Sequence, residues 1–198
     1  LSEREKKIDA QKPELVYDNI NFWKKLDKDK TYLLSCDPSS GVNEDNSVIT
    51  AFEFPSMEQV LEFYTSSLSS SQLYSKYKSI LKYFDTHGGD VYFTFERNSV
   101  GESIAALYET DLEPPDATLV NDPKGEGLGF YTSPANKGKY CIKMKELIES
   151  GTVKINSLSL ITELKSFTRV GNTFKALEGA TDDRVMALFL IIRMIENI

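Results

Sequence analysis

Cysteine and histidine are scarce in this sequence of 198 residues, which contains two cysteines and a single histidine. Cys36 and Cys141 have no ligand-like spacing, which is typical of a protein in a reducing cytoplasm that carries no structural disulfide. His87 lies in the segment THGG, whose glycines are typical of a turn that ends a helix. We therefore interpret His87 as a loop residue without a catalytic role.

Long apolar runs are also missing. The longest, residues 185–195, is interrupted by Arg193 and is shorter than the roughly 20 residues that a membrane-spanning helix requires. No basic region precedes an apolar stretch at the N-terminus, so we expect neither a secretory signal nor a membrane partner. The phosphate-binding pattern G-x-x-x-x-G-K-[ST] is absent, so an ATPase of that type is not expected in this sequence.

Basic charge is in deficit, since the formal net charge is −7. Proteins that act on nucleic acid usually have a basic face, so this balance predicts weak intrinsic affinity for DNA. The lysines gather in residues 24–30 and 137–145, where the alternative explanation is the solvated face of a helix. A carboxylate-lined metal site would itself contribute negative charge that bound cations offset.

The order of the predicted elements indicates an α/β fold. Residues 1–26 are expected to form a charged linker and an N-terminal packing segment, ahead of one domain at 27–198. Apolar runs and helical spacing predict strands at 32–36, 47–54, 59–65, 91–95 and 117–120, and helices at 72–84, 99–107, 139–150, 158–164 and 182–195. A hairpin is expected at 167–175, and the loop at 121–138 is long enough to be functional or disordered. This order predicts a mixed sheet with helices on both faces, the ribonuclease H type of fold.

Acidic residues stand where the chain changes direction. Asp37 ends one buried strand, Glu96 ends another, and Asp183 opens an apolar helix. Asp37 could simply begin a turn, and Asp182 and Asp183 could interact with the helix dipole while Thr181 serves as the N-cap. Glu96 has no such use, because the S-x-x-E box at 99–102 already offers a cap for the helix that follows it.

Taken together, these acidic residues predict a metal site. In a ribonuclease H-like sheet the first and fourth strands are parallel neighbours, so Asp37 and Glu96 would meet at one edge, and the last helix could bring Asp183 there. Gathered carboxylates repel one another unless divalent cations neutralise them, and oxygen ligands favour Mg²⁺ or Mn²⁺. Two such ions would serve a phosphodiesterase. Asp182 is either a cap or a further ligand. Asp45 could cap the strand that follows it, or it could support the ligands as an outer carboxylate.

Four segments resemble the nuclease domain of large terminase subunits, the DNA-packaging motors of tailed bacteriophages: YLLSCDPSSG, VYFTFERNSVGESIAALYE, KGKYCIKMKELIESGTVKI with LITELKSF, and EGATDDRVMAL. The resemblance runs from Thr31 to Ile195 and is greatest to the T-even-like group. It implies a ribonuclease H-like endonuclease that cuts concatemeric double-stranded viral DNA at the start and end of packaging, with little sequence preference.

By motif, the resemblance places the metal ligands at Asp37, Glu96 and Asp183, and a further acidic position at Asp45. It implies two Mg²⁺ or Mn²⁺ ions as cofactors. It also implies an N-terminal ATPase domain in the same full-length chain, a portal protein and a small terminase subunit as partners, and a place in the host cytoplasm at the prohead portal.

Lysines in or beside the glycine-rich loop are the candidate DNA contacts, namely Lys124, Lys137 and Lys139. They would hold the strand through its phosphates without reading sequence. Two other functions are compatible with the residues: another ribonuclease H-like nuclease of the resolvase type, and a non-catalytic module that docks on the portal.

Overall fold

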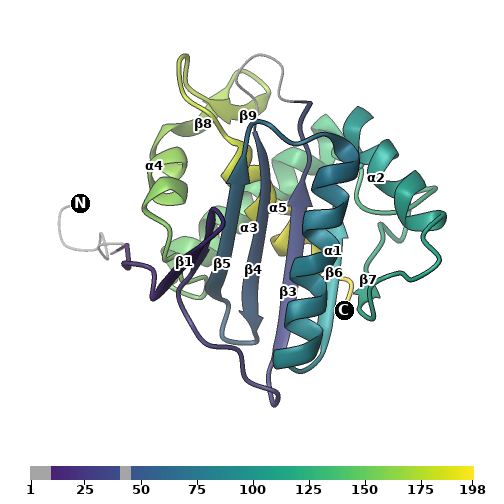
Figure 1. Cartoon of the computed structure of the whole chain (residues 1–198). Coiled ribbons are helices and arrows are strands. Elements are labelled where there is room, and N and C mark those ends of the chain that lie inside the picture. Colours follow the sequence, from purple (N-terminus) through teal and green to yellow (C-terminus); the bar gives the residue numbers. More distant parts are fainter. Residues whose placement is uncertain (1–9, 41–45) are drawn as a thin grey trace.

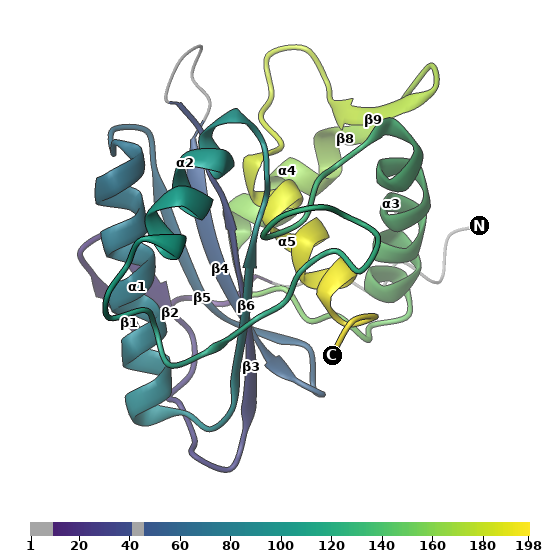
Figure 2. The same cartoon turned by 90° about the vertical axis from the view of Figure 1, so that its right-hand side faces the viewer.

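Seven strands form one mixed sheet in the computed structural model, which describes residues 10–40 and 46–198. Helices cover both faces of this sheet (Figures 1 and 2). The α/β architecture predicted from the sequence is therefore confirmed.

The middle of the sheet is an antiparallel meander of β3 (Thr31–Asp37), β4 (Ser47–Phe54) and β5 (Glu58–Thr65). Both faces of these strands are largely buried, which explains why apolar residues follow one another in them without alternation. The three strands lie within one residue of their predicted ends.

Parallel strands extend the sheet on one side of this meander. β6 (Val91–Phe95) lies beside β3 and runs in the same direction, and β7 (Thr118–Leu119) follows as a further parallel strand. On the other side, β1 (Leu15–Tyr17) and β2 (Ile20–Phe22) form a hairpin that joins through β5. The strand order is β1-β2-β5-β4-β3-β6-β7, so β3 and β6 end at the same edge.

This hairpin lies within residues 1–26, which the sequence predicts as a linker and packing segment, and the Leu15 side chain that was expected to pack is 56% exposed. The turn of the hairpin places Asp18 and Asn19 at φ of 50° and 61°, which matches the right-handed twist of the two strands. Trp23 anchors the segment, because it is buried and its indole N–H donates to the carbonyl oxygen of Gln11 at 2.9 Å.

One face of the sheet is covered by α1 (Ser70–His87) and α2 (Ser99–Glu109) (Figure 1). Leu73, Tyr77 and Phe84 of α1 belong to the buried cluster that also holds alternate residues of β3. The helical spacing read from the sequence therefore identified the buried side of α1.

Two details of these helices differ from the prediction. α1 extends to His87, which lies in the last helical turn and not in a loop, and its N-terminus is closed earlier by a capping box of Ser69 and Gln72. α2 is capped by Asn98, whose side-chain oxygen accepts two backbone N–H groups at 3.1 and 2.8 Å, and not by Ser99.

The opposite face carries three helices and an adjoining hairpin (Figure 2): α3 (Pro134–Glu149), α4 (Leu158–Ser166), β8 (Phe167–Val170), β9 (Thr173–Ala176) and α5 (Asp183–Met194). α5 packs on β3 and β4, and the hydroxyl of Ser35 donates to the carbonyl oxygen of Ala187 at 2.7 Å. This helix is buried from Val185 onward, as its uniformly apolar sequence predicts. None of the helices in the described ranges is long and apolar enough to cross a membrane.

Candidate metal centre

Two acidic residues meet where β3 and β6 end. Asp37 is the last residue of β3 and is 8% exposed, and Glu96 follows β6, where its N–H donates to the carbonyl oxygen of Cys36 at 2.9 Å. Burial raises the pKa of Asp37 well above its usual range, and the charge of Glu96 and a hydrogen bond with its side chain raise that pKa further. Two carboxylates in such contact favour a bound proton or cation.

The start of α5 brings two more carboxylates to this edge. The charges of Asp183 and Asp182 also raise the pKa of Asp37, so all four groups share one electrostatic environment. The Oδ2 atom of Asp183 accepts the backbone N–H of Asn46 at 3.3 Å and its side-chain amide at 3.2 Å. Asp183 is thereby held against the residue that precedes β4.

Asp182 occupies the N-cap position of α5 but does not act as a side-chain cap for any described residue. Its Oδ2 atom instead accepts the N–H of Ala176, at the end of β9, at 3.3 Å. Thr181, the N-cap expected from the sequence, donates its hydroxyl to Glu163 at 3.1 Å. Capping therefore does not explain the paired aspartates.

The donor set fits a hard divalent cation, because it consists of carboxylate oxygens at the edge of a buried sheet. Among residues 10–40 and 46–198, no three histidine, cysteine, aspartate or glutamate side chains are gathered tightly enough to enclose an ion. The carboxylates thus share an edge without forming a closed cage. Asp45, the predicted outer carboxylate, lies outside the described residues.

Two asparagines beside the carboxylates were missed by the sequence reasoning. The amide of Asn98 donates to Glu96 at 3.1 Å and to the carbonyl oxygen of Pro38 at 2.9 Å, so it ties the two strand ends together. The side-chain amide of Asn46 likewise donates to the carboxylate of Asp183, at 3.2 Å. The only signal for Asn98 in the sequence was its place as a cap residue directly after Glu96, and Asn46 had none.

The glycine-rich loop lies along the same edge. Phe130 donates its N–H to Phe95 at 2.9 Å and accepts the N–H of Arg97 at 2.8 Å, so the loop pairs with the chain on both sides of Glu96. The buried guanidinium of Arg193, at the far end of α5, fixes the loop start through Asp122 at 2.8 Å. Of the two alternatives for this loop, the structure supports an ordered segment that flanks the site.

The three candidate DNA contacts have different surroundings. Lys124 is exposed within the loop. Lys137 lies over the ring of Phe167 at 5.9 Å, and Lys139 lies 3.5 Å from Glu196. Lys137 and Lys139 already have partners within the chain, whereas Lys124 and Lys139 have exposed side chains.

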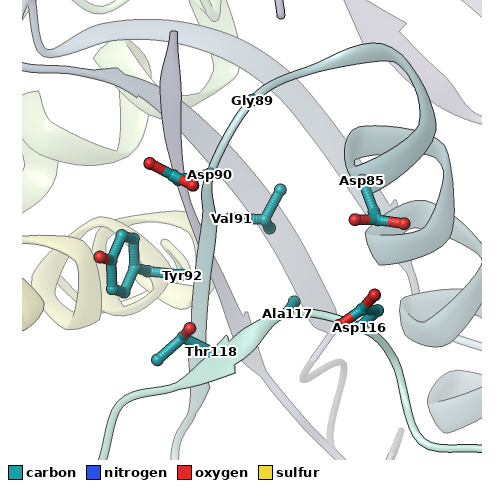
Figure 3. Close-up of a pocket in the computed structure, with 8 residues that line it drawn as sticks. All are labelled: Asp85, Gly89, Asp90, Val91, Tyr92, Asp116, Ala117 and Thr118. Atoms are coloured by element: carbon teal, nitrogen blue, oxygen red, sulfur yellow. The ribbon is translucent and has the colours of Figure 1, made fainter.

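A cavity of about 320 Å³ opens at the other end of β6 (Figure 3). Its lining includes Asp85, Asp90 and Asp116, whose side chains are exposed. Val91 begins β6 at this cavity, whereas Glu96 follows the end of that strand. The cavity is therefore separate from the candidate metal centre.

Cation binding at this edge should depend on pH. Burial is the main cause that raises the pKa of Asp183 from 3.8 to about 6. The folded state then holds this proton more tightly than the unfolded chain, so the contribution of Asp183 to the free energy of unfolding falls as pH rises through that interval.

A cation that binds at Asp183 must displace the proton, so we expect Mn²⁺ affinity to increase as pH rises through about 6. Calorimetric Mn²⁺ titrations on both sides of this pH check it, and a pH-independent affinity would contradict it.

The fold is that of large terminase nuclease domains, as comparison with solved structures shows. The nuclease of the large terminase from thermophilic phage G20c with bound magnesium has a TM-score of 0.70 at 19% identity, over 93% of this chain and 92% of that one. The same nuclease with bound cobalt gives 0.68 at 17% identity, over 93% and 92%. The large terminase nuclease domain of Thermus phage P74-26 gives 0.64 at 19% identity, over 92% and 89%. No protein-family model matches the chain.

At this level of identity the likeness establishes the fold. It confirms the ribonuclease H-like α/β architecture. The likeness is to large terminase nucleases in general, and it does not single out the T-even-like group that the sequence motifs favoured.

Proposed function

We propose that this chain is the nuclease domain of a phage large terminase subunit, most similar in its motifs to the T-even-like group. It would be a largely sequence-nonspecific endonuclease that cuts concatemeric viral DNA at initiation and termination of packaging. The observation that carries this proposal is the meeting of Asp37 and Glu96 at one sheet edge, with Asp183 close enough to raise the pKa of Asp37.

In this proposal Asp37, Glu96 and Asp183 hold the cations, and Asp182 is a further ligand. Two Mg²⁺ or Mn²⁺ ions at such an edge would supply an activated water and stabilise the departing 3′ oxygen. Asn98 and Asn46 orient Glu96 and Asp183 by donating to their carboxylates. Bound magnesium and cobalt in the similar structures support a divalent cation here.

The partners follow from the same proposal. Double-stranded DNA would pass the loop edge, with Lys124 as the accessible phosphate contact and Lys137 and Lys139 as candidates that must first leave their partners. An N-terminal ATPase domain in the full-length chain, the portal protein and the small terminase subunit would complete the motor. Its place would be the host cytoplasm, at the prohead portal.

Cleavage of supercoiled plasmid tests the proposal. We expect nicking and linearisation that require added Mg²⁺ or Mn²⁺, and we expect Glu96→Gln to reduce the rate by more than about 100-fold, because it loses a ligand and not merely a supporting bond. Activity that survives Glu96→Gln would contradict it. A preference for four-way junctions over linear duplex would indicate a resolvase, and the absence of both activities would favour a docking module.

A further inference from the structure

The helix that carries the paired aspartates is capped from outside. The first N–H groups of a helix need acceptors, which the N-cap side chain usually supplies. Asp182 does not do this for α5 within the described chain. The Oε2 atom of Glu163, on α4, accepts the backbone N–H groups of Arg184 at 2.8 Å and Val185 at 3.2 Å.

The second carboxylate oxygen of Glu163 accepts hydrogen bonds from residues on both sides of the aspartate pair. Oε1 accepts the hydroxyl of Thr181 at 3.1 Å and Nη1 of Arg184 at 2.9 Å. One carboxylate, 6% exposed, therefore binds the residue before the aspartate pair and the two residues after it. The pair itself is left out of this bonding.

Arg184 connects Glu163 to the sheet. Its Nε atom lies 3.1 Å from Oε1 of Glu62, and its guanidinium lies 3.6 Å from the ring centroid of Tyr64. Both partners are on β5. The second oxygen of Glu62 is buried without a hydrogen-bond partner in the described chain. A buried ionic cluster with an unsatisfied oxygen is weak evidence for stabilisation.

We propose that Glu163 is a positioning residue for the cation ligands. It satisfies the N-terminus of α5, so that the carboxylates of Asp182 and Asp183 are not drawn into capping and stay available to a cation. This inference rests on the proposed function, because it matters only if those carboxylates bind a cation. A carboxylate that accepts helix N–H groups offers fewer lone pairs to an ion.

Glu163→Gln tests this role with little change in volume. Glutamine has one acceptor oxygen and a donor amide, so it has no way to accept from the helix N–H groups and from Thr181 and Arg184 together. We expect its Mn²⁺ dissociation constant to rise about tenfold, with kcat for plasmid cleavage falling alike while KM for DNA stays unchanged. Mn²⁺ binding is measured by electron paramagnetic resonance, independently of cleavage.

Glu53→Gln is the matched control. Glu53 is 3% exposed and pairs with Lys24 at 2.9 Å, but it lies at the opposite end of β4 from Asp183. Its replacement is expected to lower thermal stability while leaving Mn²⁺ affinity and kcat at wild-type values.

Folded Glu163→Gln that binds Mn²⁺ as the wild type does would overturn the role of Glu163, whatever its stability. Wild-type protein that binds Mn²⁺ at Asp183 but cuts no DNA would contradict the proposed nuclease. The positioning role would then still be supported if Glu163→Gln binds Mn²⁺ more weakly than the wild type. Wild-type protein with no saturable Mn²⁺ binding would overturn both.

Discussion

Replacing Asp37 with asparagine is expected to abolish DNA cleavage and, at the same time, to stabilise the metal-free protein. The loss of activity should exceed the roughly 100-fold that removal of a ligand's supporting bond costs, because a proposed ligand itself is removed. The gain in stability follows from the raised pKa of Asp37, whose causes are burial first and the charges of Glu96, Asp183 and Asp182 next.

The sign of the stability effect is fixed by proton linkage. The folded protein binds the proton of Asp37 more tightly than the unfolded chain does, so ionisation of this group lowers the free energy of unfolding as pH rises above its ordinary range. Asparagine removes that loss. The melting temperature of Asp37→Asn in EDTA at neutral pH should therefore exceed that of the wild type, as is common when a functional site is relieved of repulsion.

Thermal unfolding followed by circular dichroism, with and without Mn²⁺, measures both halves of this prediction. Added Mn²⁺ should stabilise the wild type and leave Asp37→Asn unaffected. Asp116→Asn is the control, since its exposed carboxylate lines the cavity at the other end of β6. An Asp37→Asn protein that melts below the wild type in EDTA would mean that favourable contacts, and not repulsion, dominate around this carboxylate.

Gly101→Ala is expected to disable the same site without altering any carboxylate. Gly101 lies in the first turn of α2, directly against the backbone of Glu96. A Cβ at this position would overlap the carbonyl oxygen of Glu96 and lie 2.9 Å from its carbonyl carbon. Neither is the end of a flexible side chain, so α2 or Glu96 must move.

The expected cost is large in both stability and activity. Overpacking of this kind destabilises by about 1–3 kcal/mol. A displacement of about 1 Å at a reacting centre lowers rates by about 100-fold, and Glu96 is in the segment that must shift. Denaturant unfolding and plasmid cleavage measure the two effects.

Gly138→Ala provides a matched comparison within α3. A Cβ at Gly138 meets no described atom within 4 Å. Alanine should therefore stabilise the helix by about 0.5–1 kcal/mol through its better helix propensity. If Gly101→Ala were as stable and active as Gly138→Ala, the close approach of α2 to Glu96 would have no functional importance.

The sheet and its two helical layers followed from the sequence because their signals are local. β3 and β4 are apolar runs of strand length. The apolar stripe of α1 and the apolar sequence of α5 both predict helices that pack against the core. Helix ends were less predictable. Asn98 and not Ser99 caps α2, because both residues are good caps and only the path of the chain after Glu96 selects between them.

The candidate site was predicted in its carboxylates but not in what orients them. Asp37 and Glu96 each end a strand, which is visible in one dimension. Nothing in the segment LITELKSF marks Glu163 as functional. In the structure it caps α5, although it precedes Arg184 by 21 residues and the β8–β9 hairpin lies between them. Contacts of this kind depend on which helices become neighbours, and sequence spacing does not encode that.

The sequence by itself determined which residues are acidic at the ends of apolar elements, because burial of those elements leaves few places for charge. Only the tertiary structure decided that Asn98 and Asn46 donate to Glu96 and Asp183, and that Glu163 takes over the capping of α5 from Asp182. The physical reason is that repulsion among carboxylates and the satisfaction of buried N–H groups are both long-range in sequence, and they are settled only when the layers pack.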